Sequence, residues 1–154
     1  MGRIFGRLSM MRFASMPGAV LLIFFALFLI GCSDGLTEAQ QRNNAGVEHQ
    51  RKGRLREAIK DYNEAIGLDA QLAEPYYNRG NAYFSHGQYP RAIQDYNEAI
   101  RLDPGYAVAY ANRAQAYTFL GQDKEAQQDV DRAAGLGIDR AILDRVIEKL
   151  RSQR

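Results

Sequence analysis

A step of 34 residues separates Gly53, Gly87 and Gly121 along this chain. The same step links other small, apolar and acidic positions: Ala58, Ala92 and Ala126; Ala65, Ala99 and Ala133; Leu68, Leu102 and Leu136; Asp61, Asp95 and Asp129. A fixed period of about 34 residues is typical of a helix–turn–helix repeat that stacks into a solenoid. The period therefore predicts an all-α solenoid, whose long surface is suited to binding.

Three helix pairs are expected from this period. We predict helices over 38–51 with 55–67, over 73–86 with 89–101, and over 107–120 with 123–134. Thr37 is expected to begin the first helix, with Gln40 placed to complete a capping box. Pro75 and Pro104 fall at the breaks between pairs, where a proline costs least.

A last helix is predicted from Asp139 to about Gln153. Its apolar stripe consists of Ile142, Val146, Ile147 and Leu150. We expect this stripe to cover the open end of the solenoid as a capping helix. An amphipathic helix that binds a membrane or a partner is the alternative. The predicted division of the chain is a leader (1–31), a tether (32–37), three repeats within 38–138 (39–72, 73–106 and 107–138) and the capping helix (139–154).

The formal net charge of +2 arises at the start of the chain. Residues 1–31 contain Arg3, Arg7 and Arg12 and no acidic residue, which leaves 17 basic and 18 acidic side chains in residues 32–154. A nearly neutral remainder gives no electrostatic reason to expect nucleic acid as a partner.

Residues 1–31 have the composition of a secretory signal peptide. An apolar run, AVLLIFFALFLI, extends from Ala19 to Ile30 after the arginine-containing start. A helix of this length rises about 18 Å, which is too short for a hydrocarbon core of about 30 Å. A positive start followed by a short apolar run is typical of secretory signal peptides. Translation can begin at Met1, Met10 or Met11.

The segment Leu29-Ile30-Gly31-Cys32 at the end of this run resembles the lipobox of bacterial lipoproteins. The resemblance implies cleavage before Cys32, attachment of a diacylglycerol to its sulfur and acylation of the new amino terminus. Several acyl chains anchor a protein stably, whereas one alone does not. Cys32 is the only cysteine, so a disulfide within one chain is excluded. An incidental cysteine and an uncleaved membrane anchor are the alternatives.

Residues 73–106 carry a distinctive set of aromatic, small and proline positions: Tyr76, Gly80, Ala82, Tyr83, Ala92, Tyr96, Ala99 and Pro104. This set resembles the tetratricopeptide repeat family. Residues 107–138 match well, although Ile138 stands where a proline is common. Residues 39–72 depart most, with Arg42, Glu48 and Ala70 in place of an aromatic, a small residue and a proline. The resemblance implies that the first helix of each pair lines an inner groove.

By this resemblance the groove holds a row of asparagines, Asn44, Asn78 and Asn112. An amide both donates and accepts hydrogen bonds, so it can pair with a peptide backbone of any sequence. The row resembles the asparagine ladder of O-linked N-acetylglucosamine transferase. The alternative is that the amides are exposed polar positions or bond within the solenoid. Further residues expected on the same face are Tyr77, Asn81, Phe84, Gln115 and Phe119.

The two-carboxylate clamp of heat-shock co-chaperones is not expected. That clamp requires basic residues on neighbouring first helices. The matching places hold Asn43, Val47, Val108 and Asn112, so only Asn78 agrees with it.

The sequence contains no pattern for catalysis, metal binding or cofactor binding. It has neither an HExxH motif nor a glycine-rich phosphate loop. His49 falls where the other repeats have a tyrosine, so a packing role is expected, and His86 precedes a turn glycine and is expected to be exposed. We therefore expect no enzyme activity, no metal and no cofactor.

Together these expectations describe a bacterial cell-envelope lipoprotein that faces the periplasm. It would bind a peptide segment of another envelope protein in its groove, without chemistry, and the anchor would raise the local concentration. Ser33 after the cysteine favours the outer over the inner membrane, by resemblance. The alternative is a structural assembly factor, similar to a pilotin, for a secretin, pilus or outer-membrane complex.

A cluster of basic residues is predicted in the first turn. It consists of Arg51, Lys52, Arg54 and Arg56. We expect a solvated turn, and contact with anionic lipid headgroups is the alternative.

Overall fold

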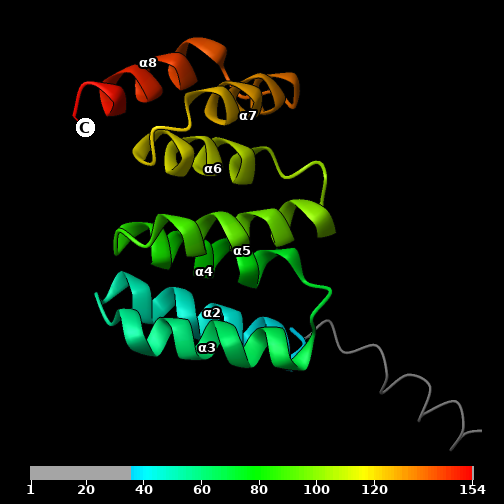
Figure 1. Cartoon of the computed structure of the whole chain (residues 1–154). Coiled ribbons are helices and arrows are strands. Elements are labelled where there is room, and N and C mark those ends of the chain that lie inside the picture. Colours follow the sequence, from blue (N-terminus) through cyan, green and yellow to red (C-terminus); the bar gives the residue numbers. More distant parts are fainter. Residues whose placement is uncertain (1–35, 154) are drawn as a thin grey trace, which may run out of the picture. The chain divides into compact units, whose positions relative to one another are not determined.

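The computed structural model describes residues 36–153, and these residues are helical apart from turns. The helices form three pairs: α2 (Glu38–Arg51) with α3 (Leu55–Leu68), α4 (Ala73–Ser85) with α5 (Tyr89–Leu102), and α6 (Ala107–Phe119) with α7 (Asp123–Gly135). A further helix, α8 (Arg140–Arg151), follows (Figure 1). The predicted all-α solenoid is confirmed, and the boundaries of the paired helices lie within one residue of the prediction. The predicted leader and Cys32 lie outside the described residues.

The first helices of the pairs form one layer. α2 contacts α4, α4 contacts α6, and α6 contacts α8, whereas each second helix packs on its own first helix and on the next one. The turns within the pairs gather at one edge of the solenoid, and the loops between the pairs lie at the other (Figure 1). Side chains from neighbouring repeats are thereby brought together on the layer of first helices.

The 34-residue glycine step marks the turns within the pairs. Gly53, Gly87 and Gly121 have φ values of 72°, 72° and 74°, in the left-handed region that side chains with a Cβ disfavour. The N–H of the residue after each glycine donates to the carbonyl five residues earlier, as in the bond from Arg54 to His49. Glycine is therefore required at each turn by the backbone itself.

A second set of small residues sets how closely the two helices of a pair approach. A Cβ built on Gly46 would lie 2.5 Å from the Tyr62 ring, and one on Gly80 would lie 2.7 Å from the Tyr96 ring. In the third repeat the same two places hold Ala114 and Val130, which are both buried. A large residue on the second helix thus faces glycine on the first, and a smaller one faces alanine.

Helix starts are fixed locally at the two ends of the solenoid. Thr37 and Gln40 form the predicted capping box at α2. At α8 the Asp139 carboxylate accepts hydrogen bonds from the N–H groups of Ala141 and Ile142. These bonds satisfy N–H groups that have no partner within the helix.

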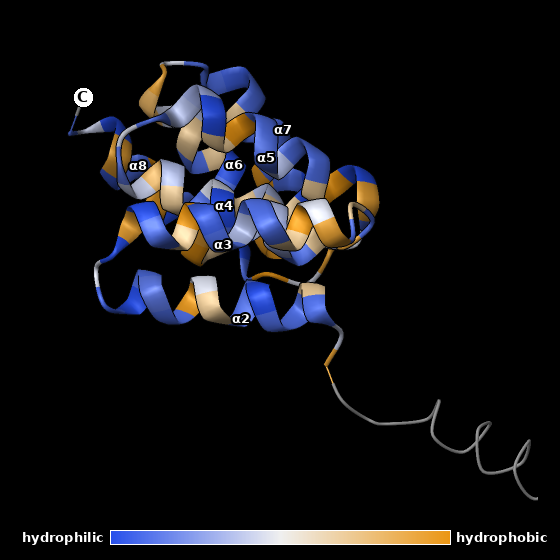
Figure 2. Ribbon diagram, turned by 90° about the horizontal axis from the view of Figure 1, so that it is seen from below, coloured by the Kyte–Doolittle hydropathy of each residue, from blue (hydrophilic) through white to orange (hydrophobic). Residues whose placement is uncertain are grey.

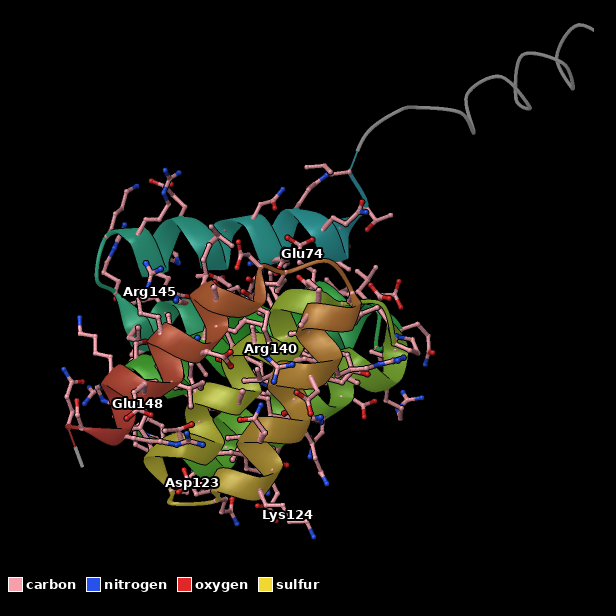
Figure 3. All side chains as sticks on the ribbon, turned by 90° about the horizontal axis from the view of Figure 1, so that it is seen from above. Glu74, Asp123, Lys124, Arg140, Arg145 and Glu148 are labelled. Carbon is pink, nitrogen blue, oxygen red and sulfur yellow. The ribbon has the colours of Figure 1, made fainter. Side chains whose placement is uncertain are left out.

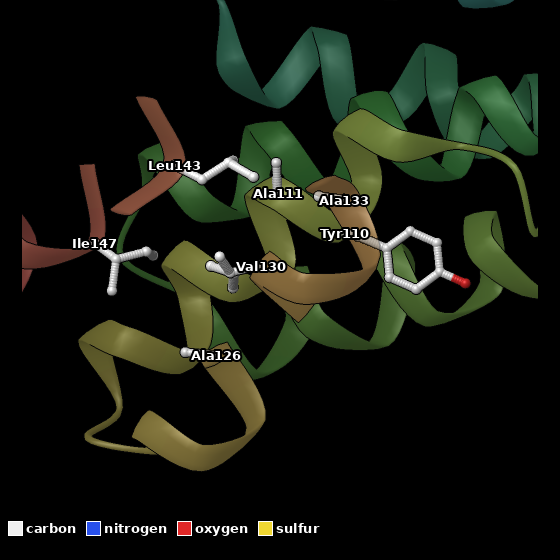
Figure 4. Packing of buried hydrophobic residues seen from close by; sticks show 8 residues of the cluster. Tyr110, Ala111, Ala126, Val130, Ala133, Leu143 and Ile147 are labelled. Atoms are coloured by element: carbon white, nitrogen blue, oxygen red, sulfur yellow. The ribbon is translucent and has the colours of Figure 1, made fainter. Parts of the chain in front are cut away.

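The capping helix α8 closes the third repeat with a different stripe from the predicted one. Leu143 and Ile147 are buried against α6 and α7, in a cluster with Tyr110, Ala126 and Val130 (Figure 4). The prediction omitted Leu143 and included Ile142, whose exposed fraction is 54%. The correction has a geometric cause, because residues four apart stack on one helix face and the 143–147 pair is the one turned toward α6.

Candidate functional site

The residues predicted for the groove all lie on the layer of first helices. Asn44 is exposed on α2, and the others are half-buried on α4 and α6: Tyr77, Asn78, Asn81, Phe84, Asn112, Gln115 and Phe119. We call these eight residues the first-helix face. Since α2, α4 and α6 contact one another in order, this face continues across all three repeats.

The three asparagines of the row do not have the same bonding. The Asn78 amide donates to Asn43 Oδ1 at 2.9 Å, and Asn43 is buried. The Asn112 amide donates to the Tyr77 hydroxyl at 3.1 Å and to Asn81 Oδ1 at 2.9 Å. Asn44 lies on the first repeat and has no hydrogen bond to any described residue.

Hydrogen bonds within the solenoid therefore use some of the amide donors that could otherwise pair with a peptide backbone. Both N–H groups of the Asn112 amide are committed, whereas Asn78 retains one N–H and its carbonyl oxygen. Asn44 retains its whole amide. The capacity to pair with a peptide backbone is thus concentrated on the α2 and α4 part of the face.

Aromatic rings occupy the α4 and α6 part of the face. The Tyr89 and Phe119 rings stack with centroids 4.5 Å apart, and the Phe84 ring meets both edge-on at 5.4 and 5.6 Å. Tyr77 lies 4.9 Å from Tyr106, and burial raises the pKa of Tyr106 to about 12. Such rings bury large area with few rotatable bonds, which suits both packing and peptide contact.

Sequence analysis missed a pair of arginine links between the repeats. Arg79 holds Asp95 of its own repeat through two hydrogen bonds of 2.7 and 2.8 Å and reaches Asn63 of the preceding repeat at 2.6 Å. Arg113 repeats the arrangement with Asp129 and Asn97. The hydrogen bond to Asp95 raises the pKa of Arg79 above its ordinary value. The signal was available, because each arginine precedes its aspartate by 16 residues in both repeats.

The first repeat has no such arginine, since Ala45 stands at that place. His49 binds Asp61 there instead, with 2.5 Å between Nδ1 and the carboxylate. His49 was expected to pack as the tyrosines of the other repeats do, but its ring makes a polar contact and remains half-buried. His86 is exposed, as predicted.

Two cavities lie away from the first-helix face. One of about 570 Å³ lies along α7 and α8, and Arg140, Arg145 and Glu148 are among its charged lining residues (Figure 3). Several of its charges are paired, as in the Arg140–Asp131 and Arg151–Asp123 bridges. The other, of about 730 Å³, lies at the edge formed by the turns of the first two repeats.

The described residues offer no metal centre, since no three His, Cys, Asp or Glu side chains among them are grouped to hold an ion. Within residues 36–153, none of the helices combines the length and apolar character that a membrane span requires. The side chains of the first-helix face offer hydrogen-bonding amides and apolar rings.

Family models identify the repeats. The model described as "Tetratricopeptide repeat" matches residues 73–106, and a second model of the same description matches residues 95–128. A third, described as "TPR repeat", matches residues 48–87. Each of the three helix pairs is thus touched by at least one family model.

Similar solved structures and one curated relative are also tetratricopeptide repeat proteins. The second TPR of Spaghetti (RPAP3), bound to HSP90 peptide SRMEEVD, is 34% identical with a TM-score of 0.64, covering 65% of this chain and 93% of that one. The TPR2B domain of yeast Sti1, in a pHsp70 complex, is 29% identical with a TM-score of 0.69, covering 75% and 98%. Human tetratricopeptide repeat protein 6 is 42% identical over 50 residues, 32% of this chain, and the chain spans only 10% of its length.

Proposed function

Because the chain belongs to the tetratricopeptide repeat family, we propose that it is a non-catalytic protein-interaction module that binds a peptide segment on its first-helix face. The proposal is supported chiefly by the amide row, in which Asn44 and Asn78 keep hydrogen-bonding capacity on the layer of first helices that also carries the rings of Phe84 and Phe119. Backbone-pairing amides next to apolar rings suit an extended peptide. Two similar domains were solved with heat-shock protein peptides bound.

The peptide preference differs from that of those domains. At the places that match the two-carboxylate clamp, this chain has no basic side chain but Asn43, Val47, Val108 and Asn112. Asn43 is also buried and bonded to Asn78, so it cannot reach a ligand carboxylate. The peptide SRMEEVD is accordingly expected not to bind, and a segment without a terminal acidic pair is the expected ligand.

Site-specific photocrosslinking tests the position of the site. A photoreactive residue is placed at Asn44 or Phe119 of the full chain in its own cells. The matched controls are Gln94 and Gln128, which are exposed at equal positions on α5 and α7. We expect one defined protein to be captured from the first-helix positions only. Equal capture from the α5 and α7 positions would contradict the proposal.

The finer part of the proposal concerns location. We propose that Cys32 is lipidated and that the module faces the periplasm of a bacterium, held at the outer membrane by the acyl chains and close to its envelope partner. The support is the sequence LIGC after a short apolar run. Cys32→Ala should abolish incorporation of a labelled fatty acid and release the protein from membranes. A mature chain that still begins before residue 32, without modification, would contradict the proposal.

A further inference from the structure

The cavity at the turn edge of the first two repeats is lined by an excess of positive charge. Its charged lining residues are Arg54, Arg56 and Arg91, with Glu57 as the single carboxylate, and His86 stands among them. We call this site the turn-edge cavity. It lies where the α2–α3 turn and the α4–α5 turn meet the same edge of the solenoid (Figure 1), away from the first-helix face.

The three arginines have no carboxylate partner among the described residues. Arg79 and Arg113, by contrast, are each held by an aspartate. Arg91 donates only to the Gln88 side chain and lies over the Tyr83 ring, with its guanidinium carbon 5.7 Å from the centroid. All three side chains are exposed and belong to a cavity without a matching anion. Such an arrangement attracts a negatively charged ligand.

The start of helix α3 adds to this charge, whereas at the start of α5 Pro90 has no N–H and the Arg91 N–H already donates to the Gln88 carbonyl. α3 begins at Leu55 and α5 at Tyr89, and neither N-cap residue, Arg54 or Gln88, makes a side-chain hydrogen bond to the helix. The first N–H groups of a helix have no partner within it, and they carry partial positive charge. The cavity thus combines guanidinium forks with N–H donors.

We propose that the turn-edge cavity binds a phosphate group. Arginine's planar fork matches phosphate oxygens through paired hydrogen bonds, and helix starts favour phosphate for the same electrostatic reason. A phosphate monoester in solution and the phosphodiester of a lipid headgroup share this chemistry. The site is independent of peptide binding on the first-helix face, so either can fail without the other.

Titration of the full chain in a non-ionic detergent tests the site. Inorganic phosphate represents the free anion, and glycerophosphoglycerol represents a lipid phosphodiester in soluble form. Calorimetry at fixed ionic strength gives the dissociation constant, and NMR follows the backbone amides of Leu55, Arg56 and Glu57. We expect saturable binding of one or both ligands with shifts at these amides. The ligand that binds more tightly identifies the source of the phosphate group.

Two variants should move the affinity in opposite directions. Arg54→Gln with Arg91→Gln should weaken binding about tenfold, through lost charge-assisted hydrogen bonds. Glu57→Gln should tighten it about threefold, because it removes the only carboxylate in the lining. Tighter binding by the Glu57→Gln variant would show that a chain substituted in the cavity lining still folds.

Charge-matched controls separate a site from general attraction. Arg145→Gln with Lys149→Gln removes the same charge from exposed positions on α8. Glu125→Gln makes the same change as Glu57→Gln, two repeats further on. Neither control should alter the affinity by more than about 1.5-fold at fixed ionic strength. Control effects as large as those at the cavity, or no saturable binding of either ligand, would overturn the proposal.

Discussion

The two junctions between repeats share an outer link but differ on the inner side. At the first junction, between α2 and α4, the inner contact is the Asn78–Asn43 hydrogen bond. At the second, between α4 and α6, the Asn112 amide donates to Tyr77 and Asn81, and the Phe84–Phe119 ring contact, extended by the stacked Tyr89, is present as well. The first repeat has Gln50 at the place that corresponds to Phe84 and Arg51 at the place that corresponds to Phe119.

The outer link is the same at both junctions, because Arg79 and Arg113 each tie an asparagine of the preceding repeat to their own aspartate. α2 itself is mostly hydrophilic (Figure 2). In a solenoid each repeat is stabilised by its neighbours, so an end repeat with a polar junction opens most easily. The first junction combines hydrogen bonds with the buried cluster of Ala58, Tyr62 and Ala82, whereas the second adds the aromatic contact of Phe84 with Phe119.

Removal of a ring at the second junction should have the largest effect. Phe119→Ala should lower the free energy of unfolding by about 3 kcal/mol, since a stacked and an edge-on aromatic contact are lost. Arg51→Ala is the control at the equivalent, exposed position two repeats away, and it should change stability by less than about 0.5 kcal/mol. Urea unfolding followed by circular dichroism measures both. Equal losses would remove the distinction between the junctions.

Gly80→Ala should cost about 2 kcal/mol, because the added Cβ overpacks the helix pair against Tyr96. Tyr96→Val in the same chain reproduces the combination of Ala114 and Val130 in the third repeat. The double variant should therefore be more stable than the sum of the two single losses predicts. Thermal unfolding of the four chains completes the cycle, and strict additivity would show that the two places do not compensate.

Asn78→Ala should lower stability by about 1 kcal/mol, since it leaves the buried Asn43 carbonyl without its donor. Hydrogen exchange should become faster in α2 and α3 and stay unchanged in α6 and α7. Asn44→Ala is the matched control: it should leave stability unchanged while it weakens peptide binding. A loss of stability in the Asn44 variant would mean that the row is structural throughout.

Raising the pH to 10 should have the smallest effect on the free energy of unfolding, and the decrease should begin only above about pH 9. Burial raises the pKa values of Tyr62 and Tyr96 above their ordinary value of 10. Their contribution to stability is complete below pH 10 and is lost as the pH rises further, because the unfolded chain releases these protons first. The ionisation of each tyrosine in the unfolded chain should lower the free energy of unfolding by about 0.4 kcal/mol at pH 10.

Tyr62→Phe and Tyr96→Phe should each flatten the decline of stability between pH 9 and pH 11. The third repeat has Val130 at the place of Tyr62 and Tyr96, and its alkali-sensitive group is instead Tyr117, whose pKa burial also raises. Stability that is independent of pH up to pH 11 would contradict the assignment of these rings as the alkali-sensitive groups.

The fold and most helix boundaries follow from the amino-acid sequence alone. The turn glycines are imposed by local backbone geometry, so a 34-residue period reports them directly. The same holds for the capping box at Thr37, which depends on residues close in sequence. Local constraints of this kind need no knowledge of how the repeats stack.

The tertiary structure decided which side chains meet between repeats. A period places Asn44, Asn78 and Asn112 on one face, but it does not show that Asn78 is bonded to Asn43, 35 residues away. Likewise the rotation that buries Leu143 and exposes Ile142 depends on where α6 lies. Hydrogen bonds and burial across a junction are set by the packing angle of neighbouring helices, which the repeat pattern leaves open.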